Sequence, residues 1–323
     1  MKPAVRARYT PAVRAAVATA AGGTPEALQD LGGFESFVHE LDVGQGPYIV
    51  KATWGGRRSA AEMGAELHFV DYLAEHGAPV CRPRALRDGT LLTTVPCEGG
   101  EFHVTAWVKA PGASLTRAGT TPAAFEAWGA LVGKLHRLSV AYPGPPAPCK
   151  RPRWEDEIGV LAEQESSESA TGAAFRALLR EIDTLPRTPA VFGAMHTDLH
   201  HGNIHWHEGR MQVFDFEDMI DFWFVSDLAV VLYYSVTAPE QSTRQALYEA
   251  RAPALWAGYA REHELPSAQR AALPWFMALR EHTLRAVLMR STRPSERSPR
   301  LIQQLEEATA RIERGEPALG LAF

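Results

Sequence analysis

The most constraining feature of the sequence is a stretch in its second half that concentrates polar side chains between apolar residues. It reads His196-Thr-Asp198-Leu-His200-His201-Gly202-Asn203-Ile204, and Val213-Phe214-Asp215-Phe216-Glu217-Asp218 follows shortly after it. The flanking apolar residues predict two short strands, with Glu208-Gly209 as the turn between them. Such a hairpin would place Asn203 and Asp215 at adjacent ends. Paired oxygen ligands of this kind suit a hard cation such as Mg²⁺.

The chain on either side of this stretch divides by pattern near residues 108–112. Before the division, strands are expected over 34–43, 48–53, 90–95 and 102–108, with a helix over 58–76. After Lys109 helical patterns dominate, including 154–165, 173–184 and 298–314. We therefore expect an α+β part over 1–108 and a larger, mainly helical part over 109–323.

The order of the polar residues is similar to the kinase catalytic loop, H-x-D-x-x-x-x-N, followed by a D-F-G-like element. The form HxDLHxGNI with DFED resembles the aminoglycoside phosphotransferase family even more closely. That family includes choline, homoserine and fructosamine kinases, and the resemblance covers nearly the whole chain in the right order. It implies a two-lobed, protein-kinase-like α+β fold, with a nucleotide-binding lobe over 1–108 and a catalytic and substrate-binding lobe over 109–323.

The resemblance also implies roles for the residues of the polar stretch. Asp198 would be the catalytic base toward an alcohol substrate, and His196 a scaffold residue of the loop. Asn203 and Asp215 would hold Mg²⁺ on the phosphates of ATP. Lys51 would pair with the α- and β-phosphates. The sequence supports the last role separately, because Lys51 lies in an otherwise apolar strand, where a charge needs a partner.

The expected partner of Lys51 is Glu66. On a helical wheel, Glu66 falls within the apolar arc of its helix, which includes Met63 and Leu67, whereas Glu62 falls nearer the edge of that arc. A carboxylate on the buried face requires a cation, so Glu66 is preferred and Glu62 is the alternate. A third reading leaves both as solvated helix charges unrelated to Lys51.

Three further residues are expected to contact the nucleotide. Gly33, in the segment LGGFESF, stands where the family has its phosphate-covering loop, although an ordinary turn explains it nearly as well. Trp107 and Val108 fall where the family's hinge binds adenine through the backbone, with a register uncertain by about two residues.

Three acidic residues follow Asp215 of the D-F-G-like element. Asp227 matches an acidic residue of the family that braces the catalytic loop, and it also suits the start of a helix. Glu217 and Asp218 replace the glycine of D-F-G. They either help with a second Mg²⁺ or merely begin a helix, and the helix start is preferred.

Composition excludes several classes of protein. Lys and Arg number 33 against 38 Asp and Glu, a net charge of -5 that gives no basic field for nucleic acid. Apolar runs are too short for a membrane span or a signal peptide, and three widely spaced cysteines predict no disulfide framework. We expect a cytoplasmic protein, and the sequence leaves its oligomeric state open.

Alternative functions remain open. The histidines at 196, 200, 201, 205 and 207 could form a zinc site, but Gly202 interrupts the run. A non-catalytic kinase-like module, or a bacterial Ser/Thr protein kinase of the same family, would also carry this pattern. The acceptor is undetermined among aminoglycosides, homoserine, choline and sugar-like alcohols. A polycationic aminoglycoside would need an acidic cleft, for which the candidates are Glu217, Asp218, Asp221, Glu240 and Glu281.

Overall fold

The computed structural model describes residues 2–115, 121–238, 240–292 and 294–323, which form two compact units. Unit 1 comprises Met1–Pro111, Pro143–Arg151 and Gln212–Glu217. Unit 2 comprises Gly112–Tyr142, Pro152–Met211 and Asp218–Phe323. The first division falls within Pro111-Gly112, the break at which the sequence composition changes. None of the described helices has the length and hydropathy needed to cross a membrane.

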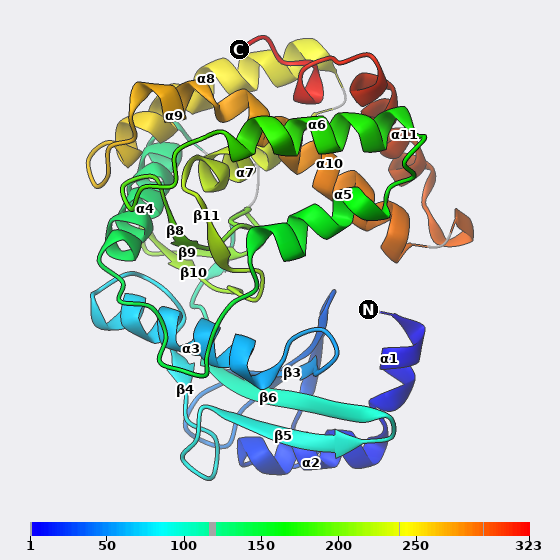
Figure 1. Ribbon diagram of the computed structural model, residues 1–323. Helices are drawn as coiled ribbons and strands as arrows, with labels where there is room; N and C mark the ends of the chain where they lie inside the picture. The colour runs from blue at the N-terminus through cyan, green and yellow to red at the C-terminus, as the bar shows by residue number, and fades with distance from the viewer. Residues whose placement is uncertain (1, 116–120, 239, 293) are drawn as a thin grey trace. The chain divides into compact units, whose positions relative to one another are not determined.

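Unit 1 is built around an antiparallel sheet in which the strands run in the order β1-β2-β3-β6-β4 and β5 also pairs with β6 (Figure 1). The long strands pair by regular alternation, and Lys51 of β3 lies between Val38 of β2 and Thr105 of β6. The strands are β1 (Gln29–Gly32), β2 (Ser36–Leu41), β3 (Tyr48–Trp54), β4 (Pro83–Arg84), β5 (Leu92–Cys97) and β6 (Gly100–Val108).

The helices of unit 1 are α1 (Pro3–Arg8), α2 (Pro11–Ala21) and α3 (Ala60–Glu75). The Thr10 side chain caps α2, and a capping box between Ser59 and Glu62 begins α3. Val50 of β3 packs with the buried face of α2 in one core cluster. Because side chains alternate along a strand, Lys51 points to the opposite face of the sheet, where α3 contributes Glu66.

Unit 2 is mainly helical. Its core helix α7 (Val225–Val236) is buried on nearly every side, as its apolar sequence predicts. The helices α4 and α8 cross closely at Gly129 and Gly258. Glycine is needed at both positions, because a Cβ there would lie within 2 Å of a main-chain oxygen of the other helix. The remaining elements are α4 (Pro122–Val140), η2 (Glu155–Gly159), α5 (Val160–Gln164), α6 (Ala170–Asp183), α8 (Gln241–Tyr259), α9 (Ser267–Ala271), α10 (Leu273–Ser291), η3 (Pro294–Glu296), α11 (Pro299–Glu313) and η4 (Ala318–Gly320).

Short strands carry the polar stretch singled out in the sequence. The order β10-β9-β7 forms one small sheet and β11-β8 another. Glu208 and Gly209 both have positive φ, 47° and 79°, and make the expected turn between β9 and β10. These strands are β7 (Ala113–Ser114), β8 (Phe192–Met195), β9 (Ile204–His207), β10 (Arg210–Val213) and β11 (Ile220–Trp223).

Two expectations from the sequence need correction. Glu217 and Asp218 do not begin a helix, because the chain continues into β11 and the next helix starts at Val225. The segment 154–165 is not one regular helix, since a π-turn over Glu155–Gly159 precedes α5. The short strands β1 and β4 were not expected at all, because neither has the alternating apolar pattern of a longer strand.

Candidate active site

Within unit 1, Lys51 and Asp215 come into direct contact across 164 positions of sequence. The Lys51 ammonium forms an ion pair with the Asp215 carboxylate, and the Glu217 carboxylate lies 3.7 Å from the same nitrogen. Burial by itself would lower the pKa of Lys51, but Asp215, Glu217 and Glu66 together raise it above its ordinary value. Lys51 is therefore a fixed cation beside two carboxylates.

The expected Lys51–Glu66 contact is not the one formed. Among the described residues, the ion pairs of Lys51 are with Asp215 and Glu217. Glu66 is only 4% exposed, which confirms its predicted place on the buried face of α3, whereas Glu62 serves in the capping box. Burial raises the pKa of Glu66, and the charges of Lys51 and Arg151 oppose that rise. Glu66 thus interacts with Lys51 electrostatically without a direct ion pair, while Asp215 makes the direct contact.

Glu217 is held from several directions in unit 1. Its carboxylate accepts a hydrogen bond from the Ser36 hydroxyl at 3.1 Å. Its carbonyl oxygen accepts hydrogen bonds from Arg151 at 2.6 Å and from Arg58 at 3.2 Å. The segment that follows Asp215 is therefore anchored to the sheet and to the 143–151 segment of the same unit.

In unit 2, Asp227 braces the loop that carries Asp198. Its carboxylate accepts hydrogen bonds from the backbone N–H groups of His196 at 3.3 Å and Thr197 at 2.8 Å. His136 lies 3.2 Å from the same carboxylate. These bonds confirm that Asp227 braces the loop. Thr197 has a φ of 66°, a strained conformation for a β-branched residue that the brace holds in place.

The surroundings of Asp198 contain a residue that the sequence analysis missed. Arg280, from α10, forms an ion pair with the Asp198 carboxylate and donates a hydrogen bond to the Tyr234 hydroxyl at 2.6 Å. His200 Nε2 lies 3.5 Å from the other carboxylate oxygen. Burial opposes the charge on Asp198, but Arg280 and His200 outweigh it and hold the pKa of Asp198 at about 2. No local pattern in the sequence points to Arg280.

Asn203 is positioned by the same loop. Its side-chain nitrogen donates to the carbonyl oxygen of Asp198 at 3.0 Å, and its backbone N–H donates to the carbonyl oxygen of His200 at 3.0 Å. The side chain is mostly buried, at 8% exposed. Asn203 precedes β9 in unit 2, and Asp215 follows β10 in unit 1. The pairing of the two at one metal ion is a prediction that the structure does not test.

The residues expected at the nucleotide have clear structural roles. Gly33 has a φ of 152°, and a Cβ there would lie 2.0 Å from the carbonyl oxygen of Ser36, so the turn requires glycine. Trp107 lies in β6 between Ile49 and Pro83 of the neighbouring strands. The backbone N–H of Val108 donates to the carbonyl oxygen of Arg82 at 2.9 Å. The sheet thus uses that donor, and adenine binding at Trp107 and Val108 stays a prediction.

The described residues contain no group of three or more His, Cys, Asp or Glu side chains placed to hold a metal ion. His200 instead accepts a hydrogen bond from the backbone of Gly202 at 2.8 Å and lies beside Asp198. A site built from oxygen donors of the protein and of a bound phosphate group remains chemically suitable, because Mg²⁺ commonly takes one or two carboxylates together with substrate phosphates.

Comparison with known proteins places these residues in a family. The family model described as "Phosphotransferase enzyme family" matches residues 26–265. Amicoumacin kinase of Bacillus subtilis (strain 168) is 30% identical over 281 residues, which is 85% of this chain and 84% of that protein.

Solved structures agree with the family match. An amicoumacin kinase in complex with AMP-PNP, Ca²⁺ and Ami has a TM-score of 0.90 at 28% identity, covering 100% of this chain and 98% of that one. A microcompartment-associated aminopropanol kinase has a TM-score of 0.77 at 23% identity, covering 94% and 97%. The α+β kinase-like fold is thereby confirmed. The chain belongs to the phosphotransferase enzyme family, and it is a kinase that acts on an alcohol group of a small molecule.

Proposed function

We propose that this kinase transfers the γ-phosphoryl group of Mg·ATP to a hydroxyl of amicoumacin or of a closely similar molecule. The use of Mg·ATP is supported by the contact of Lys51 with Asp215, because the family pattern assigns these two residues to the phosphates and to the metal. The choice of amicoumacin as acceptor is supported by the similarity to amicoumacin kinases over most of both chains. Because ATP and Mg²⁺ are cytoplasmic, we place the reaction in the cytoplasm.

The residues fit a magnesium nucleotide chemically. Asp215 and Asn203 offer hard oxygen donors, and Lys51 offers a cation whose charge burial does not remove. The bound metal would neutralise phosphate charge during transfer. Asp215 has a φ of 71°, so its carboxylate is held by a strained backbone next to Lys51. Lys51 would fix the phosphates, and Glu66 would support the charge on Lys51 from the buried face of α3.

Asp198 would position the acceptor hydroxyl and take its proton late in the transfer. With a pKa of about 2, Asp198 is ionised at neutral pH. An ionised carboxylate accepts a hydrogen bond from the hydroxyl and orients its oxygen toward phosphorus. Because the loop is braced through Asp227, this orientation costs little further ordering when the acceptor binds.

The function is tested by ATP consumption with amicoumacin, with the phosphorylated product identified by mass. The matched control is Asp198→Asn, which keeps the shape of the side chain and removes its charge. Turnover should fall by about 10²-fold or more. The affinity for Mg·ATP, measured by calorimetry, should stay within about twofold because Asp198 does not bind the nucleotide in this proposal. Near-normal turnover in the variant would refute the role of Asp198.

A further inference from the structure

The 143–151 segment of unit 1 runs against the start of helix α3 (Figure 1). The Cys149 sulfur packs against Gly64, because a Cβ on that glycine would lie only 2.6 Å from it. The backbone N–H of Lys150 donates a hydrogen bond to the carbonyl oxygen of Ala61 at 3.3 Å. The segment is rich in proline, which restricts its backbone. It is therefore a stiff piece of chain fixed to the first turns of α3.

Arg151, at the end of this segment, joins α3 to the part of the chain that carries Asp215. Its Nη1 donates to the carbonyl oxygen of Glu62 at 3.2 Å, and its Nη2 donates to the carbonyl oxygen of Glu217 at 2.6 Å. Because the guanidinium is planar and rigid, it holds the two oxygens at a fixed separation. Glu62 lies one helical turn before Glu66, and Glu217 lies two residues after Asp215. One side chain thus links the elements that carry two of the proposed site residues.

The hydrogen bonds to the main chain of Glu217 leave its carboxylate directed toward Lys51. Arg58, which is 3% exposed, donates to the same carbonyl oxygen at 3.2 Å. The carboxylate lies 3.7 Å from the Lys51 ammonium and accepts a hydrogen bond from the Ser36 hydroxyl at 3.1 Å. Because only one residue separates Glu217 from Asp215, a shift of this anchored carbonyl would move both carboxylates relative to Lys51.

Arg151 also acts on the charge of the buried Glu66. Burial raises the pKa of Glu66, Lys51 opposes that rise most strongly, and Arg151 opposes it next. The Asp215 carboxylate raises the same pKa, and Arg58 lowers it. The guanidinium of Arg151 therefore favours the ionised form of Glu66 in addition to holding the turn of α3 that precedes it.

We propose that Arg151 is a positioning residue for phosphoryl transfer, which clamps α3 to the 212–217 segment so that the carboxylates around Lys51 keep their places. The proposal rests on the proposed roles of Lys51 and Asp215 at Mg·ATP and adds a residue that holds them without touching the nucleotide. Because the clamp is part of the chain itself, α3 is held in this arrangement before any ligand binds. Such preorganisation reduces the ordering that nucleotide binding requires.

The clamp is tested by calorimetric titration with Mg·ATP. Arg151→Gln should weaken the affinity by about fivefold or more, because α3 and the 212–217 segment are no longer held together. Arg151→Lys keeps the positive charge but loses the two-pronged donor, so it should recover only part of the affinity and stay about twofold or more weaker than the wild type. Unchanged affinity in Arg151→Gln would overturn the proposal, and so would full affinity in Arg151→Lys.

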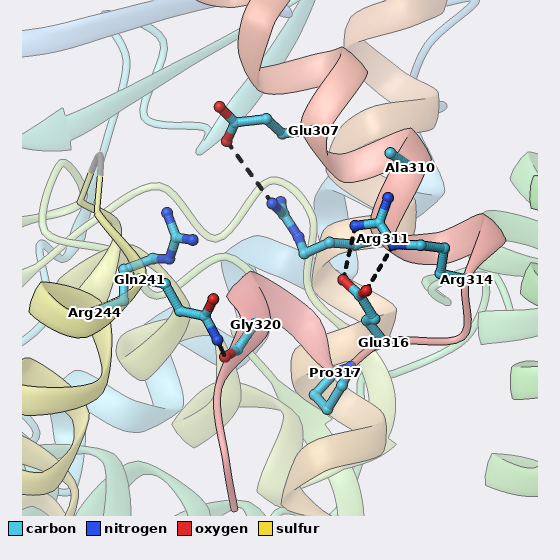
Figure 2. Close-up of a pocket in the computed structure, with 9 residues that line it drawn as sticks. All are labelled: Gln241, Arg244, Glu307, Ala310, Arg311, Arg314, Glu316, Pro317 and Gly320. Carbon is cyan, nitrogen blue, oxygen red and sulfur yellow. Dashed lines mark hydrogen bonds and ion pairs between the residues drawn. The ribbon is translucent and has the colours of Figure 1, made fainter.

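The matched control is Arg244→Gln in unit 2. Arg244 of α8 also donates to two main-chain oxygens, those of Leu319 at 2.7 Å and Ala238 at 2.8 Å, and Figure 2 shows it with Gln241 of the same helix in the lining of a pocket. This variant should lower the urea midpoint about as much as Arg151→Gln, because both lose two hydrogen bonds to the backbone. Its Mg·ATP affinity should stay within about twofold of the wild type, because Arg244 belongs to unit 2 and contacts none of the residues proposed to bind Mg·ATP. An equal loss of affinity in the control would show that stability and not the clamp sets nucleotide binding.

The position of α3 is tested separately by amide hydrogen exchange of the protein without nucleotide. Arg151→Gln should speed exchange by about threefold or more in peptides that cover α3 and the 212–217 segment, while peptides of the buried helix α7 keep the wild-type rate. Arg244→Gln should leave the α3 and 212–217 peptides unchanged. Wild-type exchange of both regions in Arg151→Gln would sink the proposal. If the wild-type protein does not bind Mg·ATP, the proposed function fails, and the exchange rates still decide whether Arg151 clamps α3.

Discussion

At the scale of single residues, the charge state of Asp198 depends on Arg280. Because the pKa of Asp198 is lowered from 3.8 to about 2 in the folded protein, its ion pair contributes stability that is present above pH 3.8 and is lost as pH falls through 2. The groups that act on this carboxylate are Arg280, His200 and His196, with Arg280 the strongest of the three. Without the Arg280 guanidinium, burial would be the main influence on the pKa of Asp198, and burial raises that pKa.

Arg280→Gln should therefore move the acid limb of the kcat/KM profile upward by at least about one pH unit, because the pKa of Asp198 rises. Arg280→Lys keeps a positive charge and should keep the limb near its original place. The pH dependence of phosphorylation, recorded for the wild type and both variants from pH 2 to 7, checks this. An unchanged acid limb in Arg280→Gln would mean that Arg280 does not set the protonation of the base.

The contact of Lys51 with Asp215 predicts which residues are energetically coupled. Unfolding by urea should give a coupling of about 1 kcal/mol between Lys51→Met and Asp215→Asn, a figure reduced by solvent because Asp215 is 32% exposed. The coupling of Lys51→Met with Glu66→Gln should be smaller, since those groups interact without a direct ion pair. A larger coupling with Glu66 would show that Glu66 is the main partner.

The sequence could predict the residues of the proposed site that lie in a local pattern. Asp198, Asn203 and Asp215 fall within one short stretch, and Lys51 stands out as a charge in an apolar strand. Arg280 and Arg151 could not be found in this way. They meet Asp198 and Glu217 across 82 and 66 positions, and nothing in their own helix or loop distinguishes them from other arginines. Only the tertiary structure brings such side chains together.

At the scale of elements, the backbone conformation of the turn between β1 and β2 depends on a single residue. Gly32 and Gly33 both have positive φ, but only Gly33 is crowded, because a Cβ at that position would lie 2.0 Å from the Ser36 oxygen. A Cβ at Gly32 meets nothing within 4 Å, so Gly32→Ala should cost only about 1 kcal/mol for its left-handed conformation.

Gly33→Ala must in addition displace the backbone of β2, so its unfolding midpoint in urea should fall clearly below that of Gly32→Ala. If this turn contacts the phosphates, Gly33→Ala should also weaken Mg·ATP binding by at least fivefold, measured by calorimetry. Equal stability of the two variants would contradict the crowding at Gly33, and unchanged affinity would remove Gly33 from the nucleotide site.

Elements with a strong local pattern were predictable, and short or irregular ones were not. The hairpin partners β2 and β3, the helix α3 and the Thr10-capped α2 all follow from alternation, helical spacing or a cap. The two-residue β4 exists because its neighbour β6 offers a free edge, which is a property of the sheet and not of Pro83 or Arg84. The sequence around Glu217 suggested a helix start, but Glu217 and Asp218 form a turn before β11, in which Glu217 accepts hydrogen bonds from Arg151 and Ser36.

At the scale of the whole molecule, unit 1 is assembled from three separate segments of chain. The 212–217 segment joins it through Val213, whose carbonyl oxygen accepts from the Cys81 N–H at 2.8 Å and whose N–H donates to the carbonyl oxygen of Pro79 at 2.8 Å. The 143–151 segment joins through Arg151, which donates to Glu217 and to the carbonyl oxygen of Glu62. The two later segments thus complete the charge balance around Lys51 as well as the packing.

A fragment of residues 1–111 should therefore be much less stable than unit 1 within the full chain. It retains Lys51 and Glu66 but lacks Asp215, Glu217 and Arg151, so the Lys51 ammonium loses both carboxylates with which it forms ion pairs in the full chain. In the fragment, Lys51→Met combined with Glu66→Gln should restore part of this loss, because it removes both uncompensated charges. In the full chain the same pair of changes should destabilise, because there Lys51 has its partners. Urea unfolding of the four proteins distinguishes these cases: if the double variant lowers the midpoint of the fragment as well, missing packing and not missing charge limits its stability.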